Sequence, residues 1–117
     1  MPKLFSTKSL RAKNRKPTHP GAILREDVFP TLMNESHEVM SQGDIADALG
    51  VSRRSVSQIL NEHRPITPDM AKRLEHFLNV SAESWLTMQH TLDLWLLDQD
   101  KKKVKEYEHI HPIAMAA

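Results

Sequence analysis

Two adjacent arginines, Arg53 and Arg54, begin a short segment in which further hydrogen-bonding side chains follow at helical spacing. Ser57 and Gln58 stand four positions after them, on the same face of a helix. An arginine can donate two parallel hydrogen bonds to O6 and N7 of guanine, and a glutamine can pair with adenine in the same bidentate way. A serine is short enough to allow close approach to a base edge or a phosphate. This combination indicates a helix that reads base pairs in a DNA major groove.

A helix-turn-helix is the element that would direct these side chains outward. Segment 41–60 reads as two short helices, with Ser41 and Ser52 as N-caps and Gly50 at the turn, where a positive φ ends the first helix. Asp44 should point back into its own helix end, as in a capping box. The spacing alone also fits an ordinary helical hairpin, and the outward polar residues favour the DNA-binding interpretation. The apolar residues expected on the buried faces are Ile45, Ala46, Leu49, Val51, Val56, Ile59 and Leu60.

Phosphate contacts are expected on both sides of the second helix. Gln42 lies in the first turn of the preceding helix, where its side chain and the backbone N–H groups can reach a phosphate. Arg64 follows the second helix in a loop that Pro65 stiffens. The alternative for each of these side chains is a solvated surface residue. The predicted DNA-binding residues are Gln42, Ser52, Arg53, Arg54, Ser57, Gln58 and Arg64.

The segment QGDIADALGVSRRSVSQILN resembles the Xre/Cro-type helix-turn-helix. The flanking stretches HPGAILRED and NEHRPITPDMAKRLEHFLNVSAESWLTMQHTLDL extend the resemblance over residues 19–97, to the HigA-type antitoxins of bacterial toxin–antitoxin pairs. The blocks RPIT-x-x-MA-x-RL and S-x-x-x-WL-x-x-Q-x-x-x-DL are specific to that branch. In one respect the chain departs from it, because PTLMNESHEVMSQ is longer by several residues. The path of residues 34–39 therefore stays open.

The resemblance implies an antitoxin that binds an inverted repeat in double-stranded DNA as a homodimer and represses its own operon. It also implies a cognate toxin, a RelE-like messenger-RNA ribonuclease, and a phosphate contact for Gln42. The two recognition helices of such a dimer would lie roughly 34 Å apart, one turn of DNA, or a multiple of that distance. Two other functions remain open, a stand-alone Xre-type transcription regulator without a toxin and a protein-interaction module that does not bind DNA.

Helical spacing along the chain predicts an all-α fold, a five-helix bundle with a central helix-turn-helix that is lambda-repressor-like by the resemblance. The first helix begins at Pro20 and should end or kink at Pro30. The fourth helix begins at Thr67, and the fifth begins at Ser81 and runs to about Asp100. The predicted parts are a flexible basic arm (1–18), a DNA-binding and dimerisation domain (19–100) and a charged, frayed tail (101–117).

The fifth helix is apolar over more than one face. A small bundle can cover only one face of such a helix, so the excess predicts a partner, most simply a second copy related by a two-fold axis. The alternative is that these residues only complete the core of the monomer. The predicted dimer-interface residues are Trp85, Leu92, Trp95 and Leu96.

The net charge of +1 conceals an uneven distribution along the chain. Residues 1–16 carry six basic and no acidic side chains, whereas the remaining ten basic and fifteen acidic side chains give the rest of the chain a charge of −5. The basic arm suits a DNA backbone or a partner protein, and the alternative is a solvated tail. A mildly acidic body is unusual for a DNA-binding protein and keeps the interaction-module interpretation open.

Composition and motifs exclude several classes of function. The chain has no cysteine, which excludes disulfides and thiolate chemistry. The one close histidine pair, His109 and His111, has no further ligands at a recognised spacing, so no metal or other cofactor is expected. No phosphate-binding glycine loop, nucleophile elbow or acid pair is present, and we expect no enzyme. No segment reads as a membrane span or a signal peptide, which favours a cytoplasmic protein.

Overall fold

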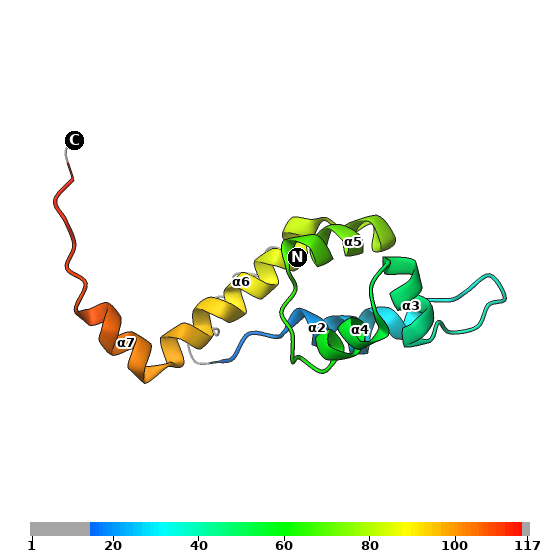
Figure 1. The fold of residues 1–117 in the computed structure, drawn as a ribbon, viewed down its shortest axis with the longest axis horizontal. Helices are drawn as coiled ribbons and strands as arrows, with labels where there is room; N and C mark the ends of the chain where they lie inside the picture. Colours follow the sequence, from blue (N-terminus) through cyan, green and yellow to red (C-terminus); the bar gives the residue numbers. More distant parts are fainter. Residues whose placement is uncertain (1–14, 116–117) are drawn as a thin grey trace.

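The computed structural model describes residues 15–115, and this part of the chain is all-α, as predicted. Helix α6 leaves the body formed by the preceding helices, and α7 continues beyond it (Figure 1). Nearly all of the predicted basic arm lies outside the described residues. Within residues 15–115 no helix is both long enough and apolar enough to span a membrane. The six α-helices are α2 (Pro20–Ile23), α3 (Gln42–Leu49), α4 (Arg53–Leu60), α5 (Pro68–Leu78), α6 (Ala82–Gln99) and α7 (Lys101–Glu108).

The first predicted helix is interrupted rather than continuous. After α2 the chain passes through a π-helical turn, η1 (Leu24–Val28), and a 3-10 turn, η2 (Phe29–Thr31). Pro30 has no N–H with which to continue an α-helix, which explains why the helical path ends here. Gly21 allows α2 to cross α4 at backbone distance, since a Cβ atom at this position would overlap the carbonyl oxygen of Ile59. This close crossing sets α2 against the C-terminal half of α4.

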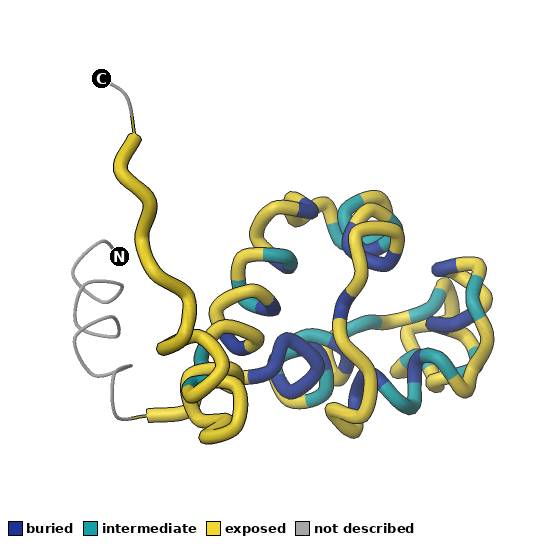
Figure 2. The backbone as a smooth tube through the Cα atoms, turned by 60° about the vertical axis from the view of Figure 1, so that its left-hand side comes forward, coloured by how far each residue is buried: buried dark blue, intermediate teal, exposed yellow. Residues whose placement is uncertain are grey.

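The core lies where α2 and η1, the two helices of the motif, α5 and the start of α6 converge (Figure 2). Leu24, Ile45 and Leu74 are each 1% exposed, and Ala71 is completely buried. The apolar residues predicted for the inner faces of the helix-turn-helix are all buried, except that Val51 is only partly buried. The periodicity of segment 41–60 therefore predicted its inner face correctly.

Residues 101–108 form helix α7, where the sequence predicted part of a frayed tail. The carboxylate of Asp100 caps this helix by accepting hydrogen bonds from the backbone N–H groups of Lys102 and Lys103, each 3.1 Å long. Lys103 also pairs with Glu106 one turn later, at 3.4 Å. The prediction took Asp100 as the end of one helix and missed that it begins another. The described part of the chain therefore has six helices, not five.

Residues 32–40, in the connection that is longer than in the resembling family, form a short hairpin-like projection that we call the tongue. Met33 and Val39 pair across it in an isolated antiparallel bridge. At its base, the backbone N–H of Met40 donates to the carbonyl oxygen of Leu32, at 2.9 Å. The tongue extends away from the body beside α3 (Figure 1). The path that the sequence left open is thus an ordered turn.

Candidate DNA-binding interface

Both helices of the central motif have the caps that the sequence predicts. The hydroxyl of Ser41 accepts a hydrogen bond from the N–H of Asp44 (3.1 Å), and the carboxylate of Asp44 accepts one from the N–H of Ser41 (3.2 Å). This capping box turns Asp44 back onto its own helix end, as predicted. Gly50 ends α3 with a φ of 72°, and the hydroxyl of Ser52 begins α4 by accepting from the N–H of Ser55 (3.0 Å). Spacing alone therefore located the motif correctly.

Arg73 on α5 ties down the turn between α3 and α4. Its Nη1 donates to the carbonyl oxygens of Leu49 (2.9 Å) and Gly50 (3.3 Å), while its Nε donates to the carboxylate of Asp69 (2.9 Å). Carbonyl groups at a helix C-terminus have no partner within the helix, and a cation there also complements the helix dipole. Sequence reasoning missed this role, although Arg73 lies in the RPIT-x-x-MA-x-RL block that carries the resemblance.

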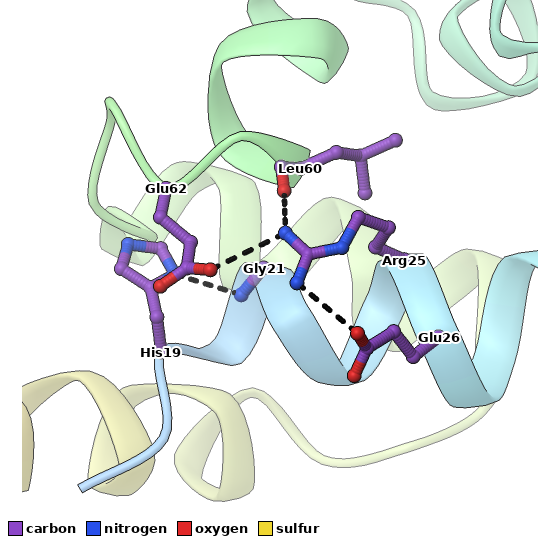
Figure 3. Close-up of polar contacts among 6 residues, drawn as sticks. All are labelled: His19, Gly21, Arg25, Glu26, Leu60 and Glu62. Carbon is purple, nitrogen blue, oxygen red and sulfur yellow. Dashed lines mark hydrogen bonds and ion pairs between the residues drawn. The ribbon is translucent and has the colours of Figure 1, made fainter. Parts of the chain in front are cut away.

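Arg25 from η1 supports the end of α4 in the same way (Figure 3). Its Nη1 donates to the carbonyl oxygen of Leu60 (2.6 Å) and to the carboxylate of Glu62 (3.2 Å), and its Nη2 reaches Glu26 (3.4 Å). The hydrogen bond to Glu62 raises the pKa of Arg25 above its ordinary value. Both helices of the motif thus end on a guanidinium group supplied by another element, which fixes their relative orientation.

His19 holds the start of α2 against this assembly. Its Nδ1 accepts a hydrogen bond from the backbone N–H of Gly21, at 2.8 Å (Figure 3), and only 7% of the residue is exposed. Burial lowers the pKa of His19 below its ordinary value, although the nearby charge of Glu62 opposes the shift. The fold therefore favours the neutral ring, which is the form whose Nδ1 can accept this bond.

Gln89 on α6 fixes the loop that follows α4. Its buried side chain accepts from the backbone N–H of Ile66 (2.9 Å) and donates to Asp93 (2.9 Å). Within that loop, Nη1 of Arg64 donates to the hydroxyl of Ser55, at 2.7 Å. This contact holds the Arg64 guanidinium beside the first turn of α4. Gln89 was also missed from the sequence, although it is the glutamine of the second block that carries the resemblance.

The residues predicted to touch DNA differ in how openly they are presented. Arg53 and Arg54 are exposed in the first turn of α4, and Gln42 is exposed in the first turn of α3. Ser57 and Gln58 are partly buried one turn further along α4. Helix α4 is thus a short helix with two exposed guanidinium groups at its N-terminal end. Arg25 and Arg73 hold the motif in place from neighbouring elements.

Ser52 and Arg64, both predicted to touch DNA, make hydrogen bonds within the chain. The Ser52 hydroxyl lies 2.9 Å from that of Ser55, in addition to capping α4, so its role within the chain is that of a helix cap. Arg64 is exposed despite its contact with Ser55. No cluster of three or more histidine, aspartate or glutamate side chains in residues 15–115 is arranged to hold a metal ion.

The predicted dimer-interface residues divide into two groups. Trp85 and Leu92 are 3% and 2% exposed, so side chains of the same chain already cover them. Trp95 is partly buried and Leu96 is 45% exposed, and Leu94 and Leu97 add to the apolar surface of this last part of α6. The exposed apolar surface of α6 therefore lies in its last part, where the predicted residues Trp95 and Leu96 stand. The interface role of the four residues stays a prediction.

Comparison with known proteins agrees with this geometry. A helix-turn-helix family model, HTH_3, matches residues 40–85, from the cap of α3 to the start of α6. Virulence-associated protein I of Dichelobacter nodosus is 39% identical over 93 residues, which cover 79% of this chain and 81% of that protein. The antitoxin GraA, solved in complex with its operator, is 32% identical with a TM-score of 0.69, and the match covers 86% of this chain and 95% of that one.

The match to a solved HigA antitoxin decides the family. The antitoxin HigA of Pseudomonas aeruginosa, solved with the higBA promoter, is 31% identical with a TM-score of 0.65, and the match covers 84% of this chain and 99% of that one. This chain belongs to the HigA-type antitoxin family. The predicted resemblance and the lambda-repressor-like, all-α fold are thereby confirmed. The family consists of helix-turn-helix antitoxins and regulators and not of enzymes.

Proposed function

We propose that this HigA-type chain binds an inverted-repeat operator as a homodimer, represses the operon that encodes it and neutralises a toxin encoded beside it. The observation that carries the proposal is the recognition helix α4, which presents Arg53 and Arg54 to solvent on a motif braced by Arg25 and Arg73. The related antitoxins GraA and HigA were both solved on operator or promoter DNA, which supports the same use of the motif here.

Each interface residue has a distinct part in this proposal. Arg53 and Arg54 bond the edges of guanine bases in the major groove, and Gln58 reads a base one turn further along, with Ser57 at a base edge or phosphate. Gln42 contacts a phosphate from the N-terminus of α3, where backbone N–H groups and the helix dipole also favour an anion. Arg64, in the loop after α4, supplies a second phosphate contact, and Ser52, the N-cap of α4, supplies a third.

Dimerisation would place two copies of α4 in successive turns of the same groove. The surface for it is the exposed apolar part of α6, which includes Trp95 and Leu96. Trp85 and Leu92 are 3% and 2% exposed in the single chain, so the proposed contact with the second copy rests mainly on the exposed part of α6. The spacing of two recognition helices, roughly 34 Å or a multiple of it, then sets the spacing of the half-sites.

A gel-shift titration over a range of salt concentrations tests the DNA-binding part of the proposal. The probe is the DNA upstream of the chain's own gene, and the control is random DNA of the same length. Preference for the upstream DNA supports the proposal, and failure to bind either DNA would leave a protein-interaction module instead.

Co-expression with the adjacent gene tests the antitoxin part. The proposal expects the adjacent gene to stop growth alone and the chain to restore it, through a RelE-like ribonuclease that the chain inhibits. If the adjacent product is harmless while the operator is bound, the chain is a stand-alone transcription regulator.

A further inference from the structure

We propose that the tongue is the surface on which the cognate toxin docks, with its acidic tip directed at the cationic groups that hold the toxin's RNA substrate. This inference rests on the antitoxin function proposed above. It goes beyond that function by assigning the contact surface and the way in which the toxin is blocked. The tongue is residues 32–40, beside α3 and apart from α6, so toxin and dimer contacts use different elements (Figure 1).

The tongue is held in one conformation by its own hydrogen bonds. The side-chain oxygen of Asn34 accepts from the backbone N–H groups of Ser36 (2.8 Å) and Glu38 (3.0 Å). The backbone N–H of Asn34 donates to the carbonyl oxygen of Glu38 (2.8 Å), and His37 takes a left-handed φ of 62° at the turn. A projection that is already ordered loses little conformational entropy when it binds a partner.

Two apolar side chains stand together on this ordered projection. Met33 and Val39 are directly opposite in the antiparallel bridge, so their side chains lie on the same face. They are 54% and 56% exposed, whereas Leu32 and Met40 at the base pack against the core. An exposed apolar pair on a rigid support is the kind of group that fills a pocket in a protein partner. The pair has no use in binding DNA phosphates.

The charges on the tongue identify the partner further. Its carboxylates, on Glu35 and Glu38, are both exposed, and no lysine or arginine lies between residues 32 and 40. Two carboxylates repel a DNA backbone, but they complement a surface built to bind phosphates. A ribonuclease needs such a cationic surface to hold RNA. The toxin of the proposed pair is therefore the occupant that fits both the apolar pair and the acidic tip.

The test measures two affinities on the full-length chain, one for the purified product of the adjacent gene and one for operator DNA. The double variant Met33→Ser/Val39→Ser should raise the Kd for that product by about tenfold or more, because the variant loses the apolar anchor. Its operator affinity and its thermal unfolding should match those of the wild type. The matched control is Ile113→Ser/Met115→Ser, which removes two apolar side chains that are 85% and 87% exposed far from the tongue, and it should change neither affinity.

A second variant, Glu35→Gln/Glu38→Gln, tests the charge argument. It should slow association with the adjacent gene product and flatten the salt dependence of that rate. If the wild-type chain does not bind the product at all, the antitoxin function fails and this inference fails with it. If wild type and tongue variants bind the product equally well, the antitoxin function stands and only the docking surface is wrong. If the variants lose operator affinity instead, the tongue is a DNA contact and the inference is overturned.

Discussion

At the scale of single residues, the proposed function makes the first turn of α4 the part of the chain that selects the bound DNA sequence. Each of Arg53→Ala and Arg54→Ala should weaken operator binding by about 1–3 kcal/mol, the discrimination carried by one bidentate contact to a base. Affinity for random DNA should fall much less, because phosphate contacts elsewhere remain. Footprinting titrations on operator and random DNA measure both effects.

The control for these variants is Lys105→Ala, which removes one exposed positive charge from α7, far along the chain from the motif. It should leave the preference for operator DNA unchanged. Wild-type operator affinity in both arginine variants would show that neither side chain reads a base.

His19 links the stability of the fold to pH. Because burial lowers its pKa in the folded chain, the unfolded chain takes up a proton first as the pH falls. The stabilising contribution is therefore complete above the ordinary histidine pKa and is lost as the pH falls through the folded value. His19→Asn keeps a good N-cap without titrating, so the drop in Tm between about pH 7.5 and about pH 5 should be smaller than in the wild type. The matched control is His90→Asn at an exposed position, which should show the same drop in Tm as the wild type. An equal drop in Tm in the wild type and both variants would contradict the assignment to His19.

At the scale of elements, the sequence predicts a helix well when residues next to its ends in the chain determine where it begins and ends. Ser41, Gly50 and Ser52 act within one helical turn of where they stand, and the boundaries of α3 and α4 follow from them. Helix α7 was missed because its four lysines read as a solvated tail, although Asp100 caps it by the same local rule. Pro30 was expected to end or kink the first helix. The π-helical turn that precedes it could not be predicted, because no residue pattern in the sequence indicates it.

The residues that brace the motif could not be found by local rules. Arg73 reaches carbonyl groups 24 and 23 positions earlier, and Arg25 reaches Leu60, 35 positions later. Such contacts depend on how whole helices pack, and a lone arginine on a helix face looks the same whether it is solvated or caps another helix. The only signal was that both arginines lie in stretches that carry the family resemblance, HPGAILRED and RPIT-x-x-MA-x-RL.

The brace at the turn can be measured directly. Arg73→Met keeps the aliphatic stem but leaves the carbonyl groups of Leu49 and Gly50 without their donor, and it should lower the free energy of unfolding by about 1–2 kcal/mol. Lys72→Met is the matched control, because Lys72 makes only an exposed pair with Glu75, and such a pair should change stability by less than about 0.5 kcal/mol. Urea unfolding measures both. Equal midpoints for the two variants would show that the turn does not depend on Arg73.

At the scale of the whole molecule, charge restricts where DNA can bind. The chain beyond residue 16 has a net charge of −5, and two of its fifteen carboxylates lie on the tongue, close to the motif in sequence. In the proposed interface, the groups that attract phosphate lie at the ends of α3 and α4 and in the loop that holds Arg64. We expect such a body to bind random DNA weakly, so that base contacts and the use of two half-sites distinguish an operator more than overall attraction does.

In the proposed dimer, the use of two half-sites depends on the apolar surface of α6. Trp95→Glu would place a charge in that surface and should give a monomer by analytical ultracentrifugation at micromolar concentration, where the wild type should be a dimer. Operator affinity should fall by about 100-fold or more, since each half-site would then be bound independently. Because Trp95 is partly buried in its own chain, Leu96→Glu at a position 45% exposed is the second variant, and both must keep the wild-type circular dichroism spectrum.

Tyr107→Glu on α7 is the matched control for the dimer surface, because it adds the same charge at an apolar residue that is 44% exposed on the next helix. It should leave the dimer intact if the interface is built on α6. A wild-type chain that sediments as a monomer while it binds a two-half-site operator tightly would contradict the dimer. A dimer that survives both α6 variants but dissociates with Tyr107→Glu would move the interface to α7. The spacing between the two recognition helices would then follow from α7, and the half-site spacing argued from α6 would have to be replaced.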